Sequence, residues 1–213
     1  MEPHFKDDNL KIHKVECGPY GNNAYLVICN ETNQSILIDT PAEPEEIINI
    51  ALDTDVKYIL ITHNHMDHLL GFEDVTSALP VEVNIGRLDS DAIDYPKVTL
   101  LDDGDEISFG KLKAKAIFTP GHTDGSTCFV IGTHLFTGDT LFPGGPGKSR
   151  SPEHLGQIID GITKKLFPLG DSVNIYPGHG PDGKMQKSKE DYEIFSSREH
   201  PAELYGDVEW LTS

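Results

Sequence analysis

Hydrophobic residues gather along this chain in short runs rich in β-branched and aromatic side chains, separated by longer amphipathic stretches. The short runs predict strands, and stretches with apolar residues at helical spacing predict helices. The expected strands cover residues 24–29, 35–39, 56–62, 81–85, 111–119, 126–131, 134–137 and 173–176. The expected helices cover residues 43–52, 72–79, 152–167 and 188–197, with Pro44 in the first turn of the first helix and Ser151 as N-cap of the third.

The same order of elements occurs twice in the chain. In the first half, a strand that ends at Asp39 is followed by a helix, a strand and His63. In the second half, a strand that leads to Asp139 is followed by a helix, a strand and His179. Two such halves would bury their sheets against each other and carry helices outside. We therefore expect an αββα sandwich of α/β class, with two mixed sheets, helices on the outer faces and one shared edge of strand ends.

Length and charge narrow the possible partners. The 213 residues fit a single domain, residues 1–213. Acidic residues outnumber basic ones by 35 to 17, and the formal net charge is -18. Such a surface repels nucleic acid and anionic lipid, so we expect a small-molecule substrate and neither nucleic acid nor membrane. The pattern does not predict an oligomeric state.

The start of the chain and its cysteines predict the compartment. The N-terminus lacks a basic segment followed by an apolar run, so it does not resemble a secretory signal. No stretch approaches the roughly 18 to 20 apolar residues of a membrane span. The three cysteines are widely spaced and form no Cys-x-x-Cys pair. We expect a reduced, cytoplasmic setting.

The densest chemical signal follows the buried-strand pattern of residues 58–61. His63, His65, Asp67 and His68 fall within six positions. Neutral imidazole is the commonest nitrogen ligand of zinc, and a carboxylate supplies charge for a second cation. Histidines two apart in an extended segment point the same way, so His63 and His65 can hold one metal ion. Asp67 and His68 lie where the chain turns toward the next helix and can face a second ion.

Other candidate ligands also follow strand-like runs and are flanked by glycine. They are His122, Asp139 and His179. Together with the first cluster they supply the number of ligands that a two-metal site needs. Asp39, in the position that corresponds to Asp139, is a candidate for a carboxylate that orients a ligand histidine, with a simple turn role as the alternative.

Four motifs occur in order between about residues 23 and 181: His-x-His-x-Asp-His, Gly-His-Thr-x-Gly-Ser, Gly-Asp-Thr-Leu-Phe and Pro-Gly-His-Gly. In these motifs the sequence resembles the metallo-β-lactamase superfamily and, within it, the glyoxalase II-like (hydroxyacylglutathione hydrolase-like) hydrolases. The resemblance implies that one metal ion is held by His63, His65 and His122, that a second is held by Asp67, His68 and His179, and that Asp139 bridges them.

The resemblance also implies the chemistry. Two divalent ions, most simply zinc with iron or manganese as alternatives, would share a bridging water and lower its pKa from about 16 toward neutrality. The resulting hydroxide would attack a carbonyl, and Asp67 and Asp139 are the carboxylates expected to take part. The expected reaction is hydrolysis of a small acyl thioester such as S-lactoylglutathione, since a thiolate leaves with little general-acid help.

Substrate contacts are less well defined by the motifs. In glyoxalase II a Gly-Lys pair after the bridging Asp contacts the glutathione carboxylate, and Gly147-Lys148 looks similar, so Lys148 is the candidate substrate contact. Two features depart from that pattern. Arg150 stands where an aromatic is expected, and the segment after His179 is shorter than the helical domain of the longer glyoxalase II enzymes.

Two other activities remain open. A lactonase or another ester hydrolase would use the same hydroxide. A persulfide dioxygenase is an oxidoreductase of the same superfamily that holds one iron with two histidines and one aspartate. Metal stoichiometry and a hydrolysis screen discriminate these activities from thioester hydrolysis.

Overall fold

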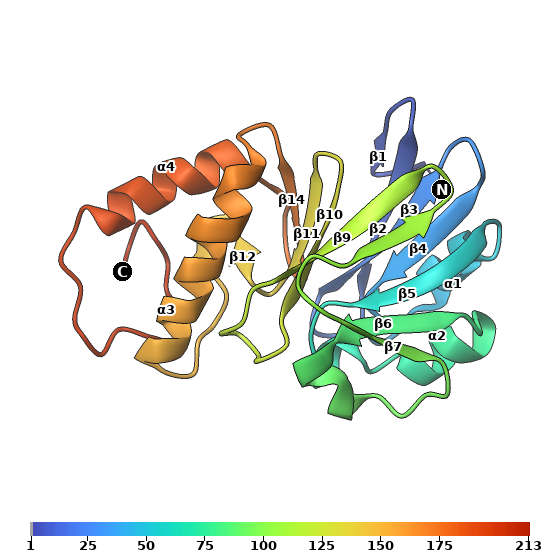
Figure 1. The fold of residues 1–213 in the computed structure, drawn as a ribbon, viewed down its shortest axis with the longest axis horizontal. Helices are drawn as coiled ribbons and strands as arrows, with labels where there is room; N and C mark the ends of the chain where they lie inside the picture. The colour runs from blue at the N-terminus through green and yellow to red at the C-terminus, as the bar shows by residue number, and fades with distance from the viewer. Residues whose placement is uncertain (1) are drawn as a thin grey trace.

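Two β-sheets face each other in the computed structural model, which describes residues 2–213 (Figure 1). The first sheet has seven strands in sequential order, antiparallel from the first to the fourth and parallel from the fourth to the seventh. They are β1 (Phe5–Lys6), β2 (Leu10–Cys17), β3 (Asn22–Cys29), β4 (Gln34–Ile38), β5 (Asp55–Ile61), β6 (Glu82–Gly86) and β7 (Val98–Leu101).

The second sheet has six strands in the order β15-β14-β11-β10-β9-β8 and is also mixed, since only β11 and β14 pair in parallel. A separate hairpin joins β12 and β13. The strands are β8 (Glu106–Phe109), β9 (Leu112–Phe118), β10 (Thr127–Ile131), β11 (His134–Gly138), β12 (Leu141–Phe142), β13 (Gly145–Pro146), β14 (Asn174–Pro177) and β15 (Gly183–Lys184).

Helices cover the outer faces, as expected for an αββα sandwich. On the first sheet lie α1 (Glu45–Ala51) and α2 (Phe72–Ala78), and on the second lie α3 (Pro152–Gly161) and α4 (Met185–Ser196) (Figure 1). Short 3-10 turns occupy Met66–His68 and Arg87–Ala92. Within residues 2–213, no helix combines the length and the apolar character needed to cross a membrane.

The helix boundaries differ from the prediction in three places. The α-helix α3 ends at Gly161 and continues as a π-helical turn, Ile162–Leu166, and a 3-10 turn, Phe167–Leu169. Helix α4 begins three residues earlier than predicted. Pro44 lies at the N-cap position of α1 and not in its first turn. The predicted cap of α3 is confirmed, because the Ser151 hydroxyl accepts a hydrogen bond from the His154 amide at 3.3 Å.

Three apolar clusters hold these layers together. One lies between the sheets and includes Tyr25, Phe129 and Phe136. A second joins the first sheet to α1 and α2, and a third joins the second sheet to α3 and α4. Trp210 is fully buried in the third cluster and fixes the C-terminal segment against the sandwich. Burial on both faces leaves the ends of the strands as the open edge where polar side chains gather.

Candidate metal centre

Strand ends from both sheets supply the predicted ligands. His63 follows β5, whose last residues are fully buried, while Asp139 follows β11 and His179 follows β14. His122 lies in the loop between β9 and β10. An apolar strand that becomes polar only at its end places its side chains at the sheet edge, and here the edges of the two sheets meet.

All seven predicted ligands come together at this edge. In each of three overlapping groups, the potential ligand atoms lie within 4.8 Å of one another. The groups are His63, His65 and His122; His63, His68 and Asp139; and Asp67, His68 and His179.

Asp139 lies between the first and last of these groups. Its Oδ1 is 3.4 Å from His68 Nε2, and its Oδ2 is 3.6 Å from both His122 Nε2 and His179 Nε2. On the other side of the centre, Asp67 Oδ2 is 3.2 Å from His179 Nε2. The Asp139 carboxylate is therefore placed to contact cations held on either side.

Several of these atoms are buried without a partner. Among residues 2–213, no hydrogen bond reaches His63 Nε2, His68 Nε2 or Asp139 Oδ1. An unpaired buried polar atom costs about 1–3 kcal/mol, so three in one place need a reason. Divalent cations bound there would satisfy all three, and imidazole nitrogens with carboxylate oxygens are suitable ligands for them. The residues present fit a metal centre.

Partners of the other ring nitrogens orient the histidines. In a neutral imidazole whose Nδ1–H donates to an acceptor, Nε2 is unprotonated and free to bind a metal. The four such contacts are His63 to Thr62 Oγ1 at 3.0 Å, His68 to Asp39 Oδ2 at 2.9 Å, His122 to the Lys148 carbonyl at 2.8 Å and His179 to the Tyr20 carbonyl at 3.1 Å.

The backbone at Asp39 has an unusual conformation. Its φ is 61°, in the left-handed region that residues other than glycine seldom occupy. The Asp39 carboxylate accepts hydrogen bonds from the Thr62 amide and the Thr62 hydroxyl, both at 2.8 Å, in addition to the one from His68. These contacts support the orienting role over the simple turn role.

We expect Asp39→Asn to lower metal affinity about 10- to 100-fold, because the His68 ring loses its anionic partner. Asparagine tolerates the left-handed conformation, so the backbone is not strained by this change. Competition with a chromophoric chelator measures the affinity. Unchanged metal content and unchanged activity would remove the orienting role.

Burial keeps two of the ligand histidines neutral. It holds the pKa of His63 well below its usual range, and His68 lowers it further. Burial also lowers the pKa of His65, with His122 adding to the effect. For Asp139, burial acts to raise the pKa, but the neighbouring His68, whose Nε2 lies 3.4 Å from Oδ1, outweighs burial and the pKa is lowered. This carboxylate is therefore ionised at neutral pH.

His68 leads to a prediction about pH. Burial lowers its pKa, but the carboxylates of Asp39 and Asp139 outweigh burial and raise it to about 10 in the metal-free protein. Because this pKa lies above the unfolded value, the contribution to stability is present at low pH and is lost as pH rises toward 10. Nε2 must lose its proton to bind a cation, so zinc uptake at neutral pH is expected to release at least one proton. Calorimetry in buffers of different ionisation enthalpy measures this, and uptake without proton release would contradict it.

Lys148 reaches the centre through its backbone. Its carbonyl accepts the His122 hydrogen bond, while its ammonium is largely exposed and lies 3.6 Å from Asp207 Oδ2. The side chain borders a cavity of about 440 Å³ beside the centre. A substrate contact by Lys148 therefore stays a prediction. Arg150, which replaces the expected aromatic, pairs with Asp124 at 2.8 Å.

Two buried polar residues at the centre were missed from the sequence. Asn22 donates to Asp67 Oδ2 at 2.8 Å and lies 3.3 Å from His179 Nε2. The Asp89 carboxylate accepts from Thr123 Oγ1 at 2.6 Å and from the Asn64 amide at 3.1 Å, and so links two ligand loops. Asn22 is the first residue of β3 and is the first of two asparagines that precede an apolar run. This polar pair is the one sequence signal that could have identified it.

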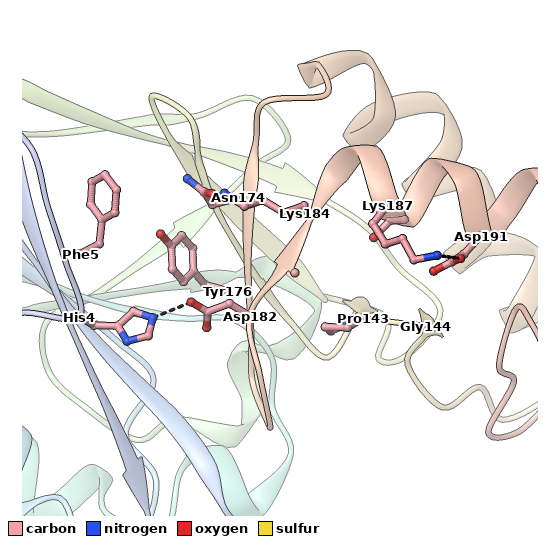
Figure 2. A pocket seen from close by; sticks show the side chains of 12 residues that line it. His4, Phe5, Pro143, Gly144, Asn174, Tyr176, Asp182, Lys184, Lys187 and Asp191 are labelled. Atoms are coloured by element: carbon pink, nitrogen blue, oxygen red, sulfur yellow. Dashed lines mark hydrogen bonds and ion pairs between the residues drawn. The ribbon is translucent and has the colours of Figure 1, made fainter.

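A larger cavity of about 670 Å³ lies away from this centre. It opens between β1, β14, β15 and the start of α4, where His4 pairs with Asp182 and Lys187 pairs with Asp191 (Figure 2). None of the seven candidate ligands lines it. Cavity size alone would therefore have pointed to the wrong place for metal chemistry.

Family comparison agrees with this geometry. The model of the metallo-β-lactamase superfamily matches residues 17–180, which is more than half of the chain. The protein belongs to the metallo-β-lactamase superfamily. Within the superfamily it is similar to the hydroxyacylglutathione hydrolases, the glyoxalase II group.

Three similar proteins carry three different functional names. A probable hydroxyacylglutathione hydrolase of Schizosaccharomyces pombe is 34% identical over 171 residues, 75% of this chain and 64% of that protein, so the chain spans less than two thirds of that relative. A probable polyketide biosynthesis zinc-dependent hydrolase of Bacillus velezensis is 28% identical over 84% of this chain and 85% of its own length. A mitochondrial persulfide dioxygenase of Bos taurus is 29% identical over 82% of this chain and 70% of its own length.

A solved structure shares the fold. It is a crystal structure of a protein in a di-iron-bound form, 28% identical, with a TM-score of 0.68, covering 83% of this chain and 96% of its own. It shows that a relative of this fold accommodates two iron ions.

Proposed function

We propose that this chain is a metal-dependent hydrolase that holds two divalent ions, most simply zinc, and cleaves a small acyl thioester of the hydroxyacylglutathione kind. The observation that carries the proposal is the convergence of four histidine Nε2 atoms, His65 and two carboxylates, three of whose atoms are buried without partners. The names of the hydrolase relatives support it.

The groups in the structure suggest how the ions would be shared. His63, His65 and His122 would hold one, Asp67, His68 and His179 the other, and Asp139 would contact both. Bound cations would polarise the scissile carbonyl and lower the pKa of a water molecule enough for it to act as a nucleophile at neutral pH.

Asp67 and Asp139 are the proposed catalytic carboxylates. Burial acts to raise the pKa of Asp67, but the hydrogen bond from Asn22 and the charge of His68 outweigh it and the pKa is lowered. Both carboxylates are therefore ionised and able to accept a hydrogen bond from an attacking water. His65 is exposed, which leaves that side of the centre open to substrate. A thiolate leaving group would need little help from a general acid.

Elemental analysis combined with a hydrolysis screen tests the proposal. We expect about two metal ions per chain and thiol release from S-lactoylglutathione or another small thioester. The screen also includes lactones, β-lactams and phosphodiesters. Turnover of lactones or oxygen esters without thiol release would reject thioester hydrolysis and favour the lactonase alternative.

Similarity to a persulfide dioxygenase supports a second candidate. That activity would use one iron held by two histidines and one aspartate, and His63, His122 and Asp139 would supply such a set. The discriminating measurement is oxygen consumption with glutathione persulfide by the iron-loaded protein. One iron per chain with oxygen uptake would favour this activity over hydrolysis.

A further inference from the structure

The C-terminal segment, residues 206–210, is fixed onto the loop that follows Asp139. The Trp210 amide donates to the Gly144 carbonyl at 2.8 Å, and the Ser149 amide donates to the Gly206 carbonyl at 3.1 Å. The Trp210 side chain has no exposed surface. The C-terminal segment is therefore packed firmly against the loop that follows Asp139.

The cavity between segment and loop borders the metal centre. Its volume is about 440 Å³, and residues 142–148 and 207–209 line it. The Gly147 amide donates to the Thr140 carbonyl at 3.1 Å, and a Cβ at Gly147 would lie only 1.7 Å from the Asp139 carbonyl oxygen. The next residue of the loop contacts another ligand, since the Lys148 carbonyl accepts a hydrogen bond from the His122 ring. None of the seven candidate ligands lines the cavity, but these backbone contacts place its loop against Asp139 and His122.

The charges in the cavity do not favour an anion. Of residues 2–213, Lys148 is the one cation that lines it, and Asp207 and Glu209 are both acidic. Asp207 Oδ2 lies 3.6 Å from the Lys148 ammonium, so the charge of this lysine is already paired within the chain. The net charge of -18 acts in the same direction.

We infer that the thiol part of a substrate bound at the centre extends into this cavity and that Asp207 determines specificity there: it selects against thioesters whose thiol carries a net negative charge and favours neutral or cationic thiols. The inference rests on the proposed thioester hydrolysis. Both side chains of the Lys148–Asp207 pair are exposed, 67% and 80%, so water and salt screen the effect. We expect changes of about three- to fivefold for each unit of substrate charge.

Three acetyl thioesters test the inference with the acyl group held constant. S-acetylglutathione is anionic, N,S-diacetylcysteamine is neutral and acetylthiocholine is cationic. We expect Asp207→Asn to raise kcat/KM about three- to fivefold for the first, to leave the second unchanged and to lower the third, with both changes reduced at high salt.

Asp160→Asn provides the matched control. Asp160 is 62% exposed and pairs with Lys164 at 2.8 Å on the outer face of α3, away from the cavity. It should leave all three kcat/KM values unchanged. Thermal denaturation checks that both variants are folded.

The outcomes separate the inference from the proposed function. If the metal-loaded protein hydrolyses none of the three thioesters or S-lactoylglutathione, the thioesterase proposal fails and this inference fails with it. If thioesters are hydrolysed but Asp207→Asn changes all three equally, or none, Asp207 does not determine specificity while thioester hydrolysis stands.

Discussion

Asp139→Asn is expected to lower kcat/KM by about a thousandfold or more, because this one carboxylate, which is only 13% exposed, is placed to serve both halves of the centre. Its two oxygens lie within 3.6 Å of three histidine nitrogens. An amide brings no charge and turns an N–H group toward nitrogens that should be free to bind a cation. Gly178 packs against the carboxylate, since a Cβ there would lie 2.3 Å from Oδ1, so the side chain has little room to turn.

Thiol release and elemental analysis measure this effect together. Asp160→Asn, which removes an exposed carboxylate far from the centre, should keep full activity and metal content. An Asp139→Asn protein that retains two ions and near-normal kcat/KM would contradict the bridging role.

Metal removal is expected to have the second large effect, complete loss of hydrolysis together with lower stability. Binding that favours the native state stabilises by about 4 kcal/mol when free ligand exceeds its dissociation constant a thousandfold. For a chain of this size that corresponds to about 10 °C in Tm. The buried atoms of His63, His68 and Asp139 that have no partner are the physical source of this loss.

Chelation followed by separate reconstitution with zinc, iron or manganese measures both quantities. The ion that restores activity at the lowest concentration identifies the preferred metal. Hydrolysis that persists after complete removal of metal would refute a metal-dependent reaction.

The candidate ligands could be predicted because they follow strongly patterned strands. The residues before His63 form an uninterrupted buried run at the end of β5, and β11 shows the same pattern before Asp139. Since a strand delivers its end to the sheet edge, two repeated patterns indicated one shared edge. The αββα arrangement is confirmed by the sheets and by the superfamily match.

Seven strands escaped prediction: β1, β2, β7, β8 and the two-residue strands β12, β13 and β15. In β2, Lys11, His13 and Lys14 interrupt the apolar positions, and no clean alternation results. The strand exists because all eight of its residues pair with β3, a contact that local sequence does not encode. Tertiary pairing here overrides a weak local signal.

Asn22 and Asp207 show the same limit at the site. Asn22 touches Asp67 from 45 residues away, and Asp207 lies 59 positions after the lysine that it pairs with. Nothing in the residues around either one indicates its partner, because only the folded chain brings the two together.

Each half of the centre draws on both sheets. In one half, His63 and His65 follow a strand of the first sheet and His122 follows a strand of the second. In the other half, Asp67 and His68 follow the same strand of the first sheet and lie close to His179, which follows a strand of the second. An ion bound there would act as a cross-link over the seam of the sandwich, joining segments more than fifty residues apart. Neither half of the chain could form such a centre alone. Tight metal binding would therefore indicate that the two sheets have packed together.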